Sequence, residues 1–183
     1  MNSIPLKPVL SALFTALIIV GAYISIPVPG LPPVVLAVFF LFLGGLILGP
    51  LWAVASGVVY LSLGVLGLGV FAGGAGGIAQ FSGPTGGFLL GYVLALLVTG
   101  LLSDRKNYNF FRNLLAVLAG GLALYAVGLP WLQMSMPSKF SNLWAVTMAM
   151  SPYMVGDLIK ALLAVGLVSL LKPLLKTYFP QGK

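Results

Sequence analysis

The 183-residue sequence contains no cysteine and no histidine, and it has two acidic residues, Asp104 and Asp157. Without cysteine there is no disulfide, no thiolate nucleophile and no cysteine-based metal site. The remaining side chains offer no paired carboxylates, serine triad or metal cluster. No phosphate-binding G-x-x-x-x-G-K-[ST] loop occurs, so any work driven by ATP must belong to another subunit. We therefore expect neither enzymatic activity nor a resident cofactor or metal.

Charge is scarce as well, since 6% of the residues are charged and 60% are hydrophobic. The mean hydropathy is +1.14. Soluble domains carry about 25% charged residues, and helices that are apolar all round are stable in lipid. These values predict an all-α integral membrane protein with one transmembrane domain over residues 1–183. The net charge of +7 does not indicate nucleic-acid binding, because the basic residues flank apolar runs and form no stripe.

The apolar runs are separated by clear breaks, which set the expected helices. The breaks are the proline-rich segment 26–33, the pair Gly49-Pro50, the glycine-rich segment 69–87 and two polar loops. With roughly 20 residues per span, we predict six transmembrane helices, over 8–26, 34–48, 51–68, 84–102, 112–132 and 152–171. A short extra helix within 142–150 is an alternative. The first run is interpreted as an uncleaved helix rather than a signal peptide, because further spans follow it directly.

The basic residues predict the orientation. On this six-helix topology, seven of the nine lie on one side: Lys7, Arg105, Lys106, Arg112, Lys172, Lys176 and Lys183. Lys139 lies on the other side and Lys160 lies within a span. By the positive-inside rule, both termini are cytoplasmic in a multi-pass protein of the cytoplasmic membrane.

Asp157 and Lys160 are the most informative polar residues. They lie three positions apart and so share one helix face, although an ionisable group at the centre of a span costs about 2.5–3.5 kcal/mol. Asp supplies acceptors and Lys supplies donors, so the pair complements a ligand that carries both N–H and C=O groups. The topology places both residues in the outer half of their helix. The alternative is an internal salt bridge that only holds the helix against its neighbours.

The glycine-rich segment 69–87 is the second candidate. Gly73 and Gly74 permit unusual backbone conformations, while Phe71 makes the segment too apolar for a solvated linker. Thr85 and Gly86 begin the following helix, whose free N–H groups favour a carboxylate. The topology puts this segment on the same external side as Asp157, which suggests one site, whereas a flexible loop or close helix packing is the alternative. Possible aromatic walls are Tyr60, Tyr92 and Tyr153.

A strip of small residues lies in the first helix. Ala12 and Ala16 are four positions apart and would leave a smooth surface for another helix. Ordinary packing within the chain is the alternative.

Several of these segments resemble one family. They include Gly64-Val-Leu-Gly-Leu-Gly-Val-Phe-Ala-Gly-Gly-Ala-Gly-Gly, Gly83-Pro-Thr-Gly-Gly-Phe-Leu-Leu-Gly-Tyr92 and Gly156-Asp-Leu-Ile-Lys160. Together they resemble the BioY family, the biotin-binding S components of energy-coupling-factor transporters. The resemblance covers nearly the whole chain in order. It departs at Val35-Leu36-Ala37, where many members have a Thr-Leu-Gln-like segment, and at Ser151-Pro-Tyr-Met-Val-Gly156; both differences bear on ligand selectivity.

The resemblance implies a six-helix S-component fold that captures biotin with high affinity from the external side for uptake. It implies that Asp157 and Lys160 hold the ureido head, with Gln80 as a further contact. It also implies that Ala12 and Ala16 dock on a transmembrane coupling subunit, which two cytoplasmic ATPases complete. Chemistry agrees, because a ureido ring has N–H donors for Asp157 and a C=O acceptor for Lys160.

Three alternatives stay open at this point. The chain is an S component for another vitamin, such as thiamine or riboflavin, or it is a membrane scaffold whose Asp157–Lys160 pair is structural. A solitary homo-oligomer with its own transport activity is the third.

Overall fold

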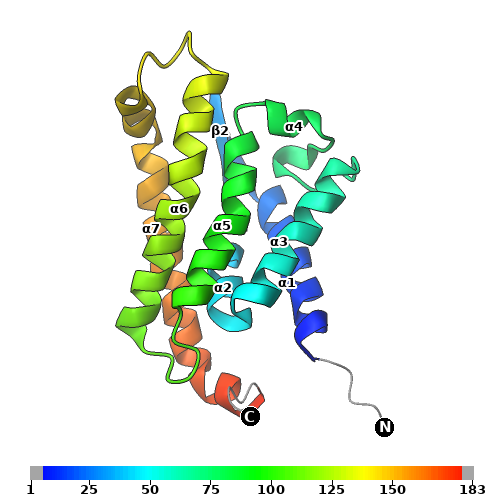
Figure 1. Cartoon of the computed structure of the whole chain (residues 1–183), viewed down its shortest axis with the longest axis vertical. Helices are drawn as coiled ribbons and strands as arrows, with labels where there is room; N and C mark the ends of the chain where they lie inside the picture. The colour runs from blue at the N-terminus through cyan, green and yellow to red at the C-terminus, as the bar shows by residue number, and fades with distance from the viewer. Residues whose placement is uncertain (1–5, 179–183) are drawn as a thin grey trace.

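The computed structural model describes residues 6–178, which form a bundle of helices lying along one long axis (Figure 1). Within these residues six helices have 12 residues or more. They are α1 (Leu6–Tyr23), α2 (Ala37–Leu48), α3 (Pro50–Val65), α5 (Gly86–Leu102), α6 (Phe110–Ser135) and α7 (Leu143–Tyr178). By length and composition α1, α6 and α7 are apolar enough to cross a membrane, and the other three are shorter apolar helices.

The proline-rich segment is a β-hairpin, which corrects the expected loop and the all-helical fold. Strands β1 (Ser25–Val28) and β2 (Leu31–Val35) pair antiparallel, with Ser25 opposite Val35. The expected helix 8–26 therefore ends at Tyr23, because a residue before proline is disfavoured in the α conformation and Pro27 follows Ile26. Prolines are tolerated because each strand has one neighbour only.

Helix α2 forms the centre of the bundle and is shorter than expected. The predicted helix 34–48 begins at Ala37, because Val34 and Val35 belong to β2. Ala37, Leu41 and Leu46 have no exposed surface. The segment therefore runs through the protein as a strand followed by a buried helix, which α1, α3, α5 and α7 surround.

The glycine-rich segment folds back on the bundle as an ordered loop. The preceding helix ends at Val65, not at residue 68, and the loop contains the short 3-10 helix η1 (Ala72–Gly74) and one helical turn, α4 (Ala79–Ser82). Gly73 and Gly74 have φ values of 69° and 77°, a conformation that glycine adopts at no steric cost. This turn brings Phe71 and Ala75 into a backbone bridge, with the Phe71 amide donating to the Ala75 carbonyl at 2.9 Å.

The last two helices are longer than expected. Helix α6 begins after Asn109, whose side chain accepts the Arg112 N–H at 3.1 Å, so that it exceeds the expected range of 112–132 at both ends. Helix α7 includes residues 143–150, so the possible extra helix is its first part and the expected start at residue 152 is wrong. Pro152 lies inside α7, and the Ser151 hydroxyl donates to the Met148 carbonyl at 2.8 Å. That carbonyl is the one to which residue 152 of an ordinary helix would donate.

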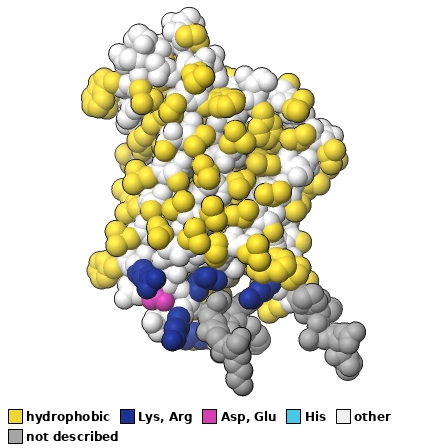
Figure 2. Space-filling model, viewed as in Figure 1, with side chains coloured by type: hydrophobic (Ala, Val, Ile, Leu, Met, Phe, Trp, Pro, Cys, Tyr) yellow, Lys and Arg dark blue, Asp and Glu magenta, His cyan; other side chains and the backbone are white. Residues whose placement is uncertain are grey.

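The two ends of the bundle differ in charge. The start of α1, the α5–α6 loop and the end of α7 lie at one end, where lysine and arginine side chains gather (Figures 1 and 2). The hairpin, α4 and the α6–α7 loop lie at the opposite end (Figure 1). Lys183, which we expected at the basic end, lies outside the described residues. This separation of charge agrees with the expected orientation, which remains a prediction.

Candidate functional site

A cavity of about 190 Å³ lies in the half of the bundle that carries the hairpin. Strand β2 and helix α2 form one wall, the segment 71–85 forms a second, and α1, α3, α5, α6 and α7 supply the rest. Most of the lining is apolar, and its charged residues are Asp157 and Lys160. The sequence therefore builds a partly open, mainly apolar space that holds a single pair of opposite charges.

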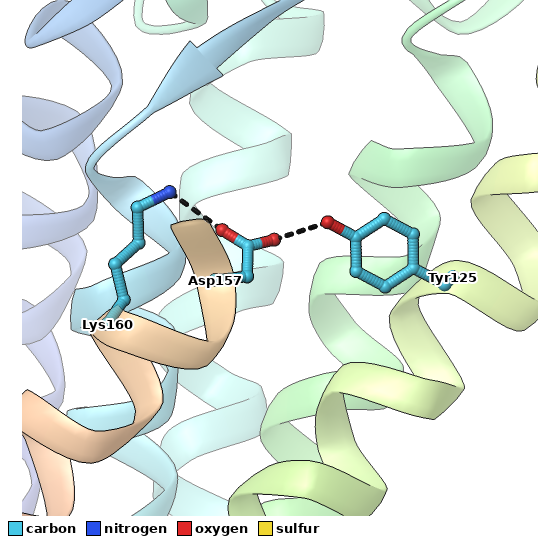
Figure 3. A network of polar contacts seen from close by, with 3 residues as sticks. All are labelled: Tyr125, Asp157 and Lys160. Atoms are coloured by element: carbon cyan, nitrogen blue, oxygen red, sulfur yellow. Dashed lines mark hydrogen bonds and ion pairs between the residues drawn. The ribbon is translucent and has the colours of Figure 1, made fainter. Parts of the chain in front are cut away.

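The polar centre of the cavity consists of three residues from two helices (Figure 3). The Lys160 ammonium lies 2.7 Å from Oδ1 of Asp157, one turn apart on α7. From α6, the Tyr125 hydroxyl donates to Oδ2 of the same carboxylate at 2.6 Å. The Lys160 and Asp157 side chains are 14% and 13% exposed, so the pair is largely shielded from water. The pair lies near the middle of α7, because this helix starts at Leu143 and ends at Tyr178.

Aromatic side chains form the deep wall. Tyr60 on α3 stacks with Tyr92 on α5, with ring centroids 6.2 Å apart and an angle of 25° between the planes. Phe71 meets Tyr60 edge to face at 5.4 Å. All three are buried, with 1–7% of their surface exposed, and all three line the cavity. Such a wall suits a flat or cyclic apolar group.

Hydrogen bonds hold the hairpin over the cavity. The Tyr153 hydroxyl on α7 donates to the Pro32 carbonyl at 2.6 Å, and the Lys139 ammonium in the α6–α7 loop donates to the Gly30 carbonyl, also at 2.6 Å. Pro32 lines the cavity and Gly30 is the tip of the hairpin. The hairpin is therefore a cover that two residues far away in the sequence fasten in place.

The glycine-rich segment is fastened in the same manner. The Tyr23 hydroxyl donates to the Gly69 carbonyl at 2.8 Å, and the Trp131 indole N–H donates to the Gly83 carbonyl at 3.1 Å. These bonds tie both ends of the segment to α1 and α6, and they present the residues between them to the cavity.

Eight of the eleven residues that the sequence suggested for binding line the cavity together: Tyr60, Phe71, Gln80, Thr85, Tyr92, Tyr153, Asp157 and Lys160. Gly73 and Gly74 do not line it, but they form the turn that places Ala72 and Ala75 there. Gly86 is buried, and its N–H already donates to the Gly83 carbonyl at 3.1 Å. Gly86 therefore lacks the free amide that we expected for a ligand carboxylate.

Sequence reasoning missed two parts of the site. Tyr125 was not among the candidate residues, although its hydroxyl donates to the Asp157 carboxylate, 32 residues away in the sequence. Pro32 and Pro33 were expected in a break between helices, and Val34 and Val35 at the start of a helix. All four residues belong instead to strand β2, which forms part of the cavity wall. The two prolines followed by two valines were a signal for extended backbone, whereas no local pattern marks Tyr125.

The strip of small residues lies on the outer surface of α1. Ala12 and Ala16 are exposed, while their neighbours Ser11 and Thr15 face inward. The Ser11 hydroxyl donates to the Trp52 carbonyl at 2.9 Å and Thr15 donates to the Ser56 carbonyl at 3.0 Å, so the polar side of α1 packs on α3. Packing of Ala12 and Ala16 within the described chain does not explain the strip.

Comparison with known proteins gives a consistent result. The sequence profile described as the BioY family matches residues 3–177. A probable biotin transporter BioY of Pyrococcus horikoshii is 40% identical over 157 residues, which are 85% of this chain and 90% of the relative. The biotin transporter BioY of Thermotoga maritima is 38% identical over 164 residues, which are 90% of this chain and 94% of the relative.

A solved structure shares the fold along the whole chain. It is the crystal structure of an S-component for biotin from an ECF-type ABC transporter. The two chains superpose with a TM-score of 0.83 at 29% identity, over 100% of this chain and 95% of the other.

Proposed function

The chain belongs to the BioY family, and we propose that its cavity captures biotin at the external face of the cytoplasmic membrane. It is the membrane subunit of a biotin transporter, an S component of an ECF-type ABC transporter and not an enzyme. The two relatives named above are called biotin transporters, one of them a probable one, and the match covers 90% and 94% of their length. What the proposal adds is the site, the side of entry and the residues that hold the ligand.

The Asp157–Lys160 pair inside the cavity is the observation that carries the proposal. Each oxygen of Asp157 accepts one hydrogen bond from the protein and retains a further acceptor position. The Lys160 ammonium uses one of its three protons on Asp157 and has two more donors. The ion pair is therefore not saturated, and it can bind N–H and C=O groups of a ureido ring while it stays intact.

The rest of the cavity suits the remainder of biotin. Tyr60, Phe71 and Tyr92 provide an apolar surface for the fused rings and the hydrocarbon chain. Gln80 and Thr85 are neutral hydrogen-bonding residues on the segment that closes the cavity, and we assign them to the carboxylate end. The 190 Å³ volume limits the ligand to one small molecule.

The chain works with partners in this proposal. It has no phosphate-binding loop, so a transmembrane coupling subunit and two cytoplasmic ATPases supply the energy for uptake. The exposed Ala12 and Ala16 on α1 form the docking strip. The basic end of the bundle faces the cytoplasm and the hairpin end faces outward, because positive residues are retained on the cytoplasmic side.

Equilibrium binding of labelled biotin to the purified, detergent-solubilised protein tests the proposal. Unlabelled biotin, desthiobiotin, thiamine and riboflavin serve as competitors. We expect saturable binding at one site per chain, displaced by biotin but not by thiamine or riboflavin. Absence of binding by a folded sample, or displacement by another vitamin instead, would contradict it.

A further inference from the structure

Tyr125 reaches the Asp157 carboxylate from the neighbouring helix α6 (Figure 3). We propose that Tyr125 is a positioning residue: it fixes the Asp157 carboxylate so that the cavity selects ligands with N–H donors. This inference rests on the proposed function of the same cavity and adds the residue that sets its selectivity.

Two donors from two helices hold the carboxylate. Lys160 on α7 donates to Oδ1 at 2.7 Å, and Tyr125 on α6 donates to Oδ2 at 2.6 Å. The terminal torsion of an Asp side chain is broad, so one donor leaves the carboxylate free to rotate. Donors on both oxygens fix its plane, and the remaining acceptor positions then have a defined direction.

The hydrogen bond from Tyr125 to Asp157 also determines whether the Tyr125 hydroxyl acts toward a ligand as a donor or as an acceptor. A tyrosine hydroxyl has one proton, and here that proton lies on the bond to Asp157. The Tyr125 oxygen therefore presents lone pairs to the cavity, as Asp157 does. A ligand N–H finds an acceptor at this point, whereas a ligand carbonyl or carboxylate would leave acceptors facing each other unpaired.

The ring of Tyr125 is held independently of its hydroxyl. Phe88 on α5 meets it edge to face, with centroids 6.1 Å apart and an angle of 86°. Because this aromatic packing remains in a Tyr125→Phe protein, the substitution removes the hydrogen bond and keeps the shape of the wall.

A double-mutant cycle separates positioning from packing. The four proteins are the wild type, Tyr125→Phe, Asp157→Asn and the double variant, each titrated with labelled biotin. We expect Tyr125→Phe to weaken binding about tenfold in the wild type, which is the effect of one hydrogen bond to a charged group. In the Asp157→Asn background the same change should have an effect of about twofold or less, because coupled residues are not additive.

Ligand selectivity is a second readout that a structural role would not change. A biotin analogue methylated on both ring nitrogens lacks the N–H donors, whereas desthiobiotin retains them. We expect Tyr125→Phe to reduce the preference for biotin over the methylated analogue about tenfold, and to leave the preference over desthiobiotin unchanged.

Tyr108→Phe is the matched control. Tyr108 is buried in the α5–α6 loop, and its hydroxyl has no hydrogen-bond partner within the described residues. The inference would be overturned if Tyr125→Phe reduced biotin affinity equally in the wild-type and Asp157→Asn backgrounds. It would also be overturned if Tyr125→Phe did not reduce affinity in the wild-type background, or if the Tyr125→Phe protein did not fold. A wild-type protein that does not bind biotin would overturn the proposed function instead.

Discussion

Asp157 and Lys160 are the two charged residues of a cavity whose other lining side chains are neutral. At the scale of single residues, the question is whether the pair binds ligand or only stabilises the bundle. Removal of one partner leaves the other charge in a poorly hydrated place, which is costly in either case. Stability alone therefore does not distinguish the two roles, and binding and stability must be measured together.

Single and double substitutions of Asp157 and Lys160 separate a role in ligand binding from a role in stability. We expect Asp157→Asn and Lys160→Ala each to weaken biotin binding at least about tenfold, because each removes a charged hydrogen-bonding group, and to lower the melting temperature. The double variant Asp157→Asn/Lys160→Met should recover much of the melting temperature, since no unpaired charge remains, without recovering binding. Equilibrium titration and thermal unfolding in detergent measure both. Unchanged biotin affinity in both single variants would leave a structural role only.

At the scale of elements, the β1–β2 hairpin and the glycine-rich segment border the cavity, and each is held by side chains from distant parts of the sequence. The bond from Lys139 to the Gly30 carbonyl joins residues 109 positions apart. Lys139 lies outside the cavity lining, so its effect on the ligand acts through the position of the hairpin.

We expect Lys139→Ala to speed the exchange of biotin with little effect on the fold. A net hydrogen bond contributes about 0.5–1.5 kcal/mol, which corresponds to a dissociation rate up to about tenfold higher. Stopped-flow exchange of labelled for unlabelled biotin measures that rate. Lys106→Ala is the control, because Lys106 is exposed and belongs to the α5–α6 loop, which lies at the opposite end of the bundle (Figure 1). Equal rates in wild type and Lys139→Ala would show that the hairpin does not limit release.

Helices α5 and α6 pack closely through glycine. A Cβ on Gly91 would lie 2.9 Å from the Leu124 carbonyl oxygen and 3.3 Å from the Leu124 Cα. Both are backbone atoms, so the helices would have to move apart. Since Tyr92 and Tyr125 follow these two residues, the same contact sets the distance across the cavity.

Gly91→Ala should therefore lower the melting temperature and weaken biotin binding. Gly166→Ala on α7 is the matched control, because a Cβ there meets nothing within 4 Å. By helix propensity alone, alanine is favoured over glycine by about 1 kcal/mol, so the melting temperature of the Gly166→Ala protein should be unchanged or higher. Thermal unfolding compares the two. A Gly91→Ala protein as stable as Gly166→Ala would contradict the importance of this contact.

At the scale of the whole molecule, the bundle has a basic end, an end that holds the cavity, and a lateral strip of small residues on α1. The cavity lies in the half that carries the hairpin, and most of the described arginines and lysines gather at the other end (Figure 2). The strip of Ala12 and Ala16 lies on the side of α1, away from the cavity lining. Ligand binding and assembly are therefore expected to be separable.

Ala16→Trp should prevent co-purification with the coupling subunit and leave biotin binding unchanged. The reason is steric, because close helix approach depends on small residues. Leu122→Trp on α6 is the control, since Leu122 is 73% exposed on another helix. Pull-down of the ATPase subunits and titration with biotin give the two readouts. Intact assembly of Ala16→Trp would place the docking surface elsewhere.

Local features of the sequence were sufficient for the membrane class, the approximate helices and most of the candidate site. These features act over a few neighbouring positions. Apolar runs and proline breaks indicate the helices, and the three-residue spacing of Asp157 and Lys160 places both on one helix face before any packing is known. The segment from residue 24 to residue 35 was predicted less well. Prolines exclude a helix there, but strand pairing depends on the partner segment and on the helices beneath it.

The sequence by itself determined that this protein is a helical membrane protein with a polar Asp157–Lys160 pair and no catalytic groups. Tertiary structure alone decided that Tyr125 completes the pair, that the hairpin covers the cavity, and that the Gly86 amide is already occupied. The physical reason is the range of the interactions. Composition and periodicity act along the chain, whereas Tyr125 and Asp157 meet only because α6 and α7 pack side by side.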